Sequence, residues 1–415
     1  MILIAPQNST EHVLERRARE LGVEIVRGAA VNGLRQDDNR VTVELTDGST
    51  CAARYVVGAD GAHSTVRGLL GVDFVGKQYQ THIMLADVRL TQPPSQALFN
   101  RISDAGAVIV VPFGGGWFRA IAWDRGRERV PLDVPLPMDE MRAAFERIAG
   151  TDFGMCEQRW SSRFLSERRQ AREYRVGRVF LAGDAAHVHS PLGGQGMNTG
   201  MQDAMNLGWK LAAAVRDRAP SGLLDTYHVE RHRVGAQVLA MTDGFNRLVD
   251  GSSAIRRAMQ ARVVRLLLWF GPTHRRLIGR LTGIGIAYAG PRHSHPWTGR
   301  RVPDLATEDG RLYELLRDGQ FVFLDFTSAG AAVHAVHRTS PQVCAVRGRR
   351  PAAGGTPAAV LVRPDGYVAW AGDDQPDVTG EAVSAVVRWC GPGCRGRSRR
   401  SATTAADAEL IGRAP

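Results

Sequence analysis

The first 60 residues combine a polar, arginine-rich stretch with short segments in which β-branched residues cluster or alternate with polar ones. The polar stretch predicts a surface helix over residues 10–21 that ends at Gly22. The other segments predict strands, because successive side chains of a strand point to opposite faces. Strands are expected at 23–26, 29–34, 41–45 and 53–57, with Asp47-Gly48 as the hairpin turn between the last two.

Between about residues 76 and 165 the hydrophobic segments become longer. They predict strands at 83–90, 107–112 and 117–123 and one helix at 138–148. This part of the chain is therefore expected to form a sheet-rich module that differs from its surroundings.

A different pattern starts at Gly177. The apolar run at 179–182 predicts a short buried strand, and a glycine-rich loop and a long helix over 197–215 follow it. Five small or apolar residues of this helix recur at steps of four and three. That spacing predicts one stripe facing a core, formed by Met201, Met205, Gly208, Ala212 and Val215.

The last part of the chain predicts a further domain after a helical connector. Its expected elements are strands at 321–326, 342–346, 359–362 and 367–370 and a helix at 381–389. Beyond residue 392 the chain is rich in Arg, Ser, Thr and Ala and has few large apolar residues, which predicts a disordered basic tail.

Composition narrows the classes of partner. The formal net charge is +11, but only Lys77 and Lys210 are lysines, and the arginines are scattered without interleaved aromatic residues. No nucleic-acid partner is therefore expected. Five cysteines give no disulfide framework, which fits a reducing cytoplasm. A signal peptide is not recognisable, and no apolar stretch approaches the roughly 20 residues that a membrane span requires, so no membrane partner is expected either.

The strongest chemical signal is the run Val179-Phe180-Leu181-Ala182-Gly183-Asp184-Ala185-Ala186-His187, followed by Pro191-Leu192-Gly193-Gly194-Gln195-Gly196-Met197-Asn198. A buried strand ends at a glycine, presents one carboxylate and passes through a glycine loop into a helix. Helix N-termini carry unpaired N–H groups and partial positive charge, which suits an anionic ligand atom. A carboxylate at a strand end suits sugar or ribityl hydroxyls. A glycine loop on its own favours the alternative, a structural turn and helix entry.

This run resembles the second FAD motif of the class A flavoprotein monooxygenases, the FAD-dependent aromatic hydroxylases. The resemblance implies that Asp184, after Gly183, binds the ribityl chain. It also implies that the following loop lies beside the isoalloxazine ring, with contacts from Pro191, Gly193, Gly194, Gln195, Gly196, Met197 and Asn198.

A second run, Gly58-Ala59-Asp60-Gly61-Ala62-His63-Ser64-Thr65-Val66-Arg67, is by itself an ordinary turn after a strand. In context it resembles the Asp-Gly motif of the same family, which implies that Asp60, Gly61 and Arg67 take part in FAD and NAD(P)H binding. Asp60 precedes Asp184 by roughly 120 residues, as in that family, with the sheet-rich segment between them. Two motifs in the family's order are more specific than either one.

Two weaker matches lie near the N-terminus. Pro6-Gln7-Asn8 resembles the strand-to-helix junction where the family places a glutamine against FAD, which makes Gln7 a candidate contact. The alternative for this segment is a simple helix cap. Val31 matches the family's adenine-side backbone position.

The C-terminal segment resembles the thioredoxin-like extension of the phenol, polyketide and rifampicin hydroxylase branch, down to Val362-Arg363-Pro364-Asp365-Gly366. Cys390 and Cys394 are separated by three residues and follow the last predicted helix, whereas a thioredoxin site has two residues between its cysteines and follows the first strand. We therefore expect the extension to be structural.

The resemblance implies an α/β protein with a p-hydroxybenzoate hydroxylase-like fold: a Rossmann-like FAD-binding domain, an inserted sheet-rich substrate domain and a thioredoxin-like domain. The expected divisions are 1–76 and 166–245 for the FAD-binding domain, 77–165 for the substrate domain, 246–294 for a helical connector, 295–392 for the thioredoxin-like domain and 393–415 for the tail.

It further implies an NAD(P)H-dependent monooxygenase that hydroxylates an aromatic or polyketide-like small molecule with O2 through a flavin C4a-hydroperoxide. A homodimer is a candidate assembly. No catalytic side chain and no metal site stands out, which is expected where the oxygen chemistry belongs to the cofactor. Quinone-type or epoxidising monooxygenases are neighbouring alternatives.

One family feature has no match. The resemblance implies an opening strand, G-x-G-x-x-G and helix for the FAD pyrophosphate, but residues 1–60 contain no such glycine triplet. A start codon assigned too late, a degenerate gene product and a partner that supplies the unit are the competing explanations, and we favour the first. The rival function is a truncated, non-catalytic remnant or binding protein that no longer holds FAD.

Overall fold

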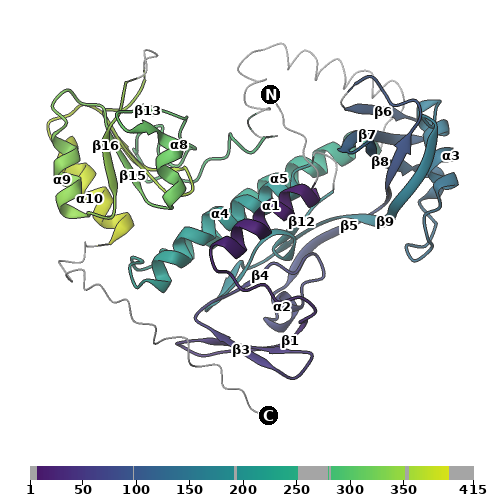
Figure 1. Cartoon of the computed structure of the whole chain (residues 1–415), viewed down its shortest axis with the longest axis horizontal. Coiled ribbons are helices and arrows are strands. Elements are labelled where there is room, and N and C mark those ends of the chain that lie inside the picture. Colours follow the sequence, from purple (N-terminus) through teal and green to yellow (C-terminus); the bar gives the residue numbers. More distant parts are fainter. Residues whose placement is uncertain are drawn as a thin grey trace. The chain divides into compact units, whose positions relative to one another are not determined.

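The computed structural model describes residues 7–96, 98–190, 194–250, 279, 282–350 and 355–391, without the side chains of residues 80, 81 and 245–250. The chain divides into two compact units, Met1–Asp217 with Ser221–Ala289, and Arg218–Pro220 with Gly290–Pro415. Each unit is described by itself (Figure 1). Most of the helical connector expected at 246–294 and the tail expected at 393–415 lie outside the described residues.

The first unit opens with helix α1 (Gln7–Glu20) and a three-stranded antiparallel sheet of β1 (Val31–Gln36), β2 (Val41–Leu45) and β3 (Thr50–Ala53). The strand predicted at 23–26 is wrong. This segment pairs with none of the described strands, and Val26 is 65% exposed. The β-branched residues of this segment therefore did not suffice to predict a strand, because a strand also needs a neighbouring strand to pair with.

A small second sheet has the order β10-β11-β4. Strand β4 (Val56–Gly58) runs parallel to β11 (Val179–Leu181), and β10 (Arg175–Val176) is antiparallel to β11. Short helix α2 (Thr65–Leu69) packs closely on this sheet. A Cβ atom at Gly58 would lie 2.8 Å from Cγ1 of Val66, so the approach requires glycine.

The largest sheet is antiparallel throughout and has six strands. Its order is β12 (His187–Val188), β9 (Met155–Ala171), β5 (Phe74–Leu90), β8 (Trp117–Asp124), β7 (Gly106–Gly114) and β6 (Phe99–Ser103). A 3-10 turn, η1 (Arg125–Arg127), follows β8. Strands β5 and β9 are long enough to reach from the sheet to the Asp60 and Asp184 motifs.

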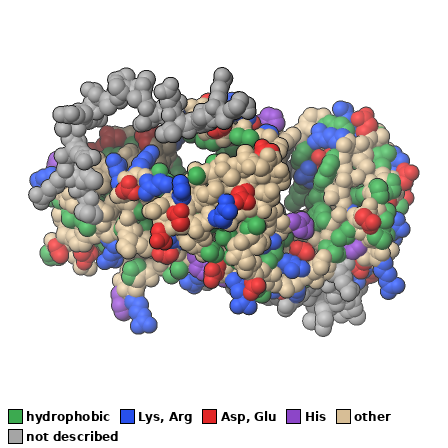
Figure 2. Space-filling model, turned by 90° about the horizontal axis from the view of Figure 1, so that it is seen from below, with side chains coloured by type: hydrophobic (Ala, Val, Ile, Leu, Met, Phe, Trp, Pro, Cys, Tyr) green, Lys and Arg blue, Asp and Glu red, His purple; other side chains and the backbone are tan. Residues whose placement is uncertain are grey.

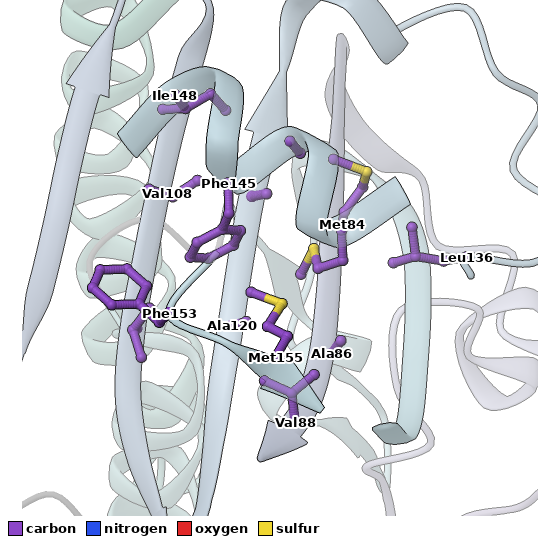
Figure 3. Packing of buried hydrophobic residues seen from close by; sticks show 14 residues of the cluster. Met84, Ala86, Val88, Val108, Ala120, Leu136, Phe145, Ile148, Phe153 and Met155 are labelled. Atoms are coloured by element: carbon purple, nitrogen blue, oxygen red, sulfur yellow. The ribbon is translucent and has the colours of Figure 1, made fainter. Parts of the chain in front are cut away.

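Helix α3 (Met138–Ala149) covers one face of this sheet, close to the helix predicted at 138–148. Phe145 and Ile148 of the helix pack on residues from four strands (Figure 3). The buried strand residues of this core are Met84, Ala86, Val88, Val108, Val110, Ala120, Ala122 and Met155. The opposite face carries the separate apolar group of Ile83, Ala107 and Trp123, with Ile121 and Phe164 against it.

Two long helices, α4 (Gly196–Val215) and α5 (Asp225–Asp250), complete the first unit after the 3-10 turn η2 (Gly183–Ala185). The predicted inner stripe of α4 is wrong, since Met205 is 57% and Val215 49% exposed. The buried residues are instead Thr199, Asp203, Asn206, Leu207, Lys210 and Ala214. This mainly polar face is buried because charged residues of α5 pair with Asp203 and Lys210.

The second unit is built on a four-stranded sheet with the order β16-β15-β17-β18. Its strands are β15 (Val322–Asp325), β16 (Cys344–Arg347), β17 (Ala359–Val362) and β18 (Val368–Gly372), close to the four predicted positions. Helices α9 (Ala331–Thr339) and α10 (Val378–Cys390) share one apolar core with the sheet. The other face packs on the segment of β13 (Ala306–Thr307), β14 (Gly310–Arg311), α8 (Leu312–Leu315) and η3 (Leu316–Asp318).

On the face drawn in Figure 2, basic and acidic side chains are interspersed. The net charge of +11 thus does not form a surface of one sign there. Among the described helices, none combines the length and the apolar character that crossing a membrane requires.

Candidate cofactor site

The Gly183-Asp184 turn lies where buried strand β11 ends. Gly183 has a φ of +58°, a conformation that glycine adopts without strain. The Asp184 side chain is exposed and makes no hydrogen bond or ion pair with any residue that the structure describes. An acceptor carboxylate is thus held at the end of a rigid strand and is available to a ligand.

A cavity of about 550 Å³ opens beside this turn. Both sequence motifs contribute to its wall, together with α1 and one side of α4. The lining residues are Gln7, Val57, Ala59, Gly61, Ala182, Gly183, Asp184, Gly196, Met197, Gly200, Met201, Ala204, Leu207, Gly208 and Leu211. Met201 and Gly208 belong to the stripe that the helical pattern predicted to face a core, and in the structure these two residues face the cavity instead.

The first turn of α4 meets the cavity without a capping side chain from its N-cap residue. Gln195 is the N-cap residue, and its side chain makes no capping hydrogen bond. Gly196 and Met197, the first two residues of the helix, both line the cavity. Free N–H groups and the positive end of the helix dipole favour an anion or an electron-rich ring edge there.

Several glycines leave the cavity wall without side chains. A Cβ atom built on Gly61, Gly196 or Gly208 would meet no atom within 4 Å. The backbone at these positions is therefore open to a ligand that approaches closely. The Asp184 carboxylate, the amides at the start of α4 and the glycine walls together fit the hydroxyl-bearing chain and the electron-rich ring edge of a flavin nucleotide.

Asp60 has a different environment from Asp184. Its Oδ1 accepts a hydrogen bond from Ser64 Oγ at 2.5 Å, and its Oδ2 accepts one from the backbone N–H of Val66 at 3.0 Å. Asp60 therefore fixes the start of helix α2, while its neighbours Ala59 and Gly61 line the cavity. Any contact of this carboxylate with a ligand would use its remaining lone pairs.

Arg67 joins the two motifs. Its guanidinium donates to the carbonyl oxygen of Ala62 at 2.8 Å and to that of Ala185 at 2.9 Å. It also stacks on the Phe74 ring, 3.8 Å from the ring centroid. Burial lowers the pKa of Arg67, but a guanidinium stays charged at neutral pH. The sequence motif thus acts here by holding the Asp60 and Asp184 segments together.

The remaining predicted contacts are distributed unevenly. Gln7 lines the cavity, although its side-chain amide donates to Glu11. Val31 begins β1 in the separate three-stranded sheet and is not among the described lining residues, and neither is Asn198. Gln195 is buried, and its carbonyl oxygen accepts hydrogen bonds from Thr199. Gly194 lies two residues before Gly196, which lines the cavity. Pro191 and Gly193 are outside the described residues.

Reasoning from the motifs missed Asp203. This fully buried residue of α4 accepts a hydrogen bond from the backbone N–H of Gly183 at 3.0 Å. Asp203, Asn206 and Lys210 recur at helical spacing, which is the sequence signal of a second, polar face. The same helix also carries the apolar residues Met201 and Met205, so its sequence pattern does not identify a single buried face.

Comparisons with known proteins show the family of the chain. The FAD binding domain family matches residues 1–242, and the family described as the C-terminal part of aromatic-ring hydroxylases matches residues 295–393. Rifampicin monooxygenase of Streptomyces venezuelae is 42% identical over 401 residues, which are 95% of this chain and 81% of the relative.

Solved structures are also similar. The anhydrotetracycline hydroxylase OxyS from Streptomyces rimosus has a TM-score of 0.81 and 37% identity, covering 94% of this chain and 80% of its own. CabE, an aromatic hydroxylase from angucycline biosynthesis, has a TM-score of 0.81 and 39% identity, covering 94% and 81%.

The fold and the matched families define an FAD-binding protein. The chain belongs to the FAD-dependent aromatic-ring hydroxylases. It is a flavin-dependent monooxygenase with FAD as cofactor and NAD(P)H as reductant, as the resemblance implied. These matches favour the enzyme over the remnant that was the rival interpretation.

Proposed function

We propose that this chain hydroxylates a polycyclic aromatic or polyketide-like molecule with O2, and that FAD binds in the cavity beside Asp184. The observation that carries the proposal is the arrangement of three features on one cavity. These are the free Asp184 carboxylate, the uncapped start of α4, and two motifs tied together by Arg67.

Each residue has a simple task in this proposal. Asp184 accepts hydrogen bonds from the ribityl hydroxyls. The amides of Gly196 and Met197, with the positive end of the α4 dipole, favour electron density at the ring edge that faces them. Gly61 and Gly208 leave room for close approach. FAD, when bound, supplies the activation of O2 by electrons from NAD(P)H, and the chain orients it and excludes water.

The substrate is proposed to lie against the sheet face opposite α3. That face carries the buried residues Ile83 and Trp123 with the partly buried Phe164 against them, and an apolar, aromatic face of this kind suits a flat ring system. The named relatives act on rifampicin and anhydrotetracycline, which supports a substrate of this kind. We also propose the division of the chain made from the sequence: residues 1–76 and 166–245 for FAD, 77–165 for the substrate and 295–392 as a structural extension.

The test is substrate-dependent oxidation of NADPH by the flavin-loaded protein in the presence of ¹⁸O2. A panel of anhydrotetracycline-like and rifamycin-like phenols provides the substrates. We expect one labelled oxygen atom in the product of at least one of them. A protein that binds FAD but consumes no NADPH with any of these phenols would contradict the hydroxylase, and one that binds no FAD would contradict the proposed site as well.

A further inference from the structure

Helices α4 and α5 are joined by two buried ion pairs. Asp203 pairs with Arg231 at 2.6 Å, and Lys210 pairs with Glu230 at 2.9 Å. Asp203, Arg231 and Lys210 are fully buried. Both pairs connect the same two helices, and among the described contacts the Asp203 pair also connects to the candidate cofactor site.

The Asp203 carboxylate holds three groups. Its Oδ1 accepts from Arg231 Nε at 2.6 Å. Its Oδ2 lies 2.7 Å from His187 Nε2 and accepts the Gly183 N–H at 3.0 Å. Burial alone would raise the pKa of Asp203, but His187 and Arg231 outweigh burial and lower it below its ordinary value. The group is therefore a carboxylate at neutral pH.

Asp203 Oδ2 thus forms hydrogen bonds with both ends of one short segment, Gly183 and His187. Gly183 begins the turn η2, and His187 begins β12 four residues later. Asp184 lies between these two anchors and directs its carboxylate toward the cavity. Because the Gly183 N–H points inward to Asp203, the turn cannot rotate without breaking a hydrogen bond to a buried charge.

Arg231 completes the support. Its Nη2 donates to the carbonyl oxygen of Thr199 at 3.2 Å, and its Nη1 donates to Tyr288 Oη at 3.2 Å. Asp203 raises the pKa of Arg231 despite burial, which acts in the opposite direction. The guanidinium thus fixes Asp203 from the side remote from the turn.

The second pair lacks this connection. Lys210 Nζ donates to Asn206 Oδ1 at 2.7 Å and to Glu230. Gly183 and His187 direct their hydrogen bonds to Asp203 and not to this pair. Lys210 lies seven residues further along α4, about 10 Å by the rise of an α-helix.

We propose that Asp203 is a positioning residue for FAD, which acts by fixing the segment from Gly183 to His187 and so the direction of the Asp184 carboxylate. This inference rests on the proposed function. It predicts that loss of the Asp203 charge makes the segment from Gly183 to His187 more mobile and weakens FAD binding. Loss of the Glu230 charge should lower the stability of the protein but change neither the mobility of this segment nor FAD binding.

The test compares Asp203→Asn with the matched control Glu230→Gln. Hydrogen–deuterium exchange in the absence of flavin measures how fast the backbone amide of Gly183 and those of its neighbours exchange. We expect faster exchange over residues 183–187 in D203N and wild-type exchange there in E230Q. Titration with FAD should then give a dissociation constant raised at least about tenfold in D203N and changed less than about twofold in E230Q.

Equal exchange over 183–187 in the two variants, or equal FAD affinity, would overturn the inference. Failure of the proposed function has a different signature, because the wild-type protein itself would then bind no FAD. In that case the exchange comparison still decides whether Asp203 holds the segment.

Discussion

The sheet β10-β11-β4 and the sheet of the second unit differ in what lies beside them. Strands β15 and β17 are completely buried between two apolar layers, one formed by α9 and α10. Strand β11 is equally buried, but helix α4 turns Asp203, Asn206 and Lys210 inward and presents Met201 and Gly208 to a cavity. The first arrangement packs both faces of the described strands with apolar side chains, and the second leaves one side of α4 facing a cavity.

The difference shows how a site is kept open in a folded protein. In the second unit two apolar clusters pack on the sheet, although Arg363 and Asp365 also form a buried ion pair there. Burial raises the pKa of the Cys390 thiol to about 12, so this cysteine stays protonated and is a poor nucleophile. In the first unit buried ion pairs hold the helices, which frees the apolar side of α4 for the ligand.

The largest expected effect is on the apolar core of the second unit. Phe323 is fully buried, and Phe323→Ala should cost about 3–5 kcal/mol of stability through the cavity it leaves. Urea unfolding followed by tryptophan fluorescence measures the loss, with Phe323→Leu as the milder control. FAD affinity should stay within about twofold of wild type. A larger change would contradict the proposal that the core of the second unit is independent of the FAD site.

The second-largest effects are expected for the two aspartates of the motifs, Asp184 and Asp60, which should differ in whether FAD affinity or Tm changes. Asp184→Asn should weaken FAD binding about ten- to a hundredfold with little change in Tm, since no described residue bonds to that carboxylate. Asp60→Asn should lower Tm, because Ser64 and Val66 lose a charged acceptor. Flavin fluorescence and thermal melts of both variants make the comparison, and the reverse pattern would refute the assignment.

A smaller effect is expected where α2 meets β4. Gly58→Ala places a methyl group against Val66 and should cost about 1–3 kcal/mol, as overpacked cores do. Gly68→Ala is the control, because its added Cβ meets no atom within 4 Å and the residue is helical. Chemical unfolding of both variants should rank them in that order. Equal stabilities would show that α2 shifts freely.

The smallest effect concerns pH. Burial lowers the pKa of His189 below its ordinary 6.5, so the folded state disfavours the protonated ring. Above pH 6.5 the group contributes nothing to stability. Below it the unfolded chain takes up a proton that the folded chain resists, so stability falls as pH falls. His189→Gln should therefore lose about 1–3 °C less in Tm than wild type between pH 7.5 and 5.5. If the variant and the wild type lost the same Tm between these two pH values, the result would contradict a buried His189 ring with a lowered pKa.

Sequence patterns predicted the second unit well because its strands are apolar runs between turns. The strand predicted at 359–362 coincides with β17, although α9 was not anticipated. The two motifs were also recognisable from local residues. The buried face of α4 was not, because an inward Asp203 depends on partners elsewhere in the chain, among them Arg231 of the next helix, and hydrophobic periodicity does not contain such pairings.

The central claim is that the cavity beside Asp184 holds FAD in this chain. Equilibrium dialysis of the purified 415-residue protein against FAD tests it most directly. We predict saturation at about one FAD per chain, with affinity reduced in Asp184→Asn by the factor given above. A wild-type protein that remains folded and shows no saturable FAD binding would contradict the account.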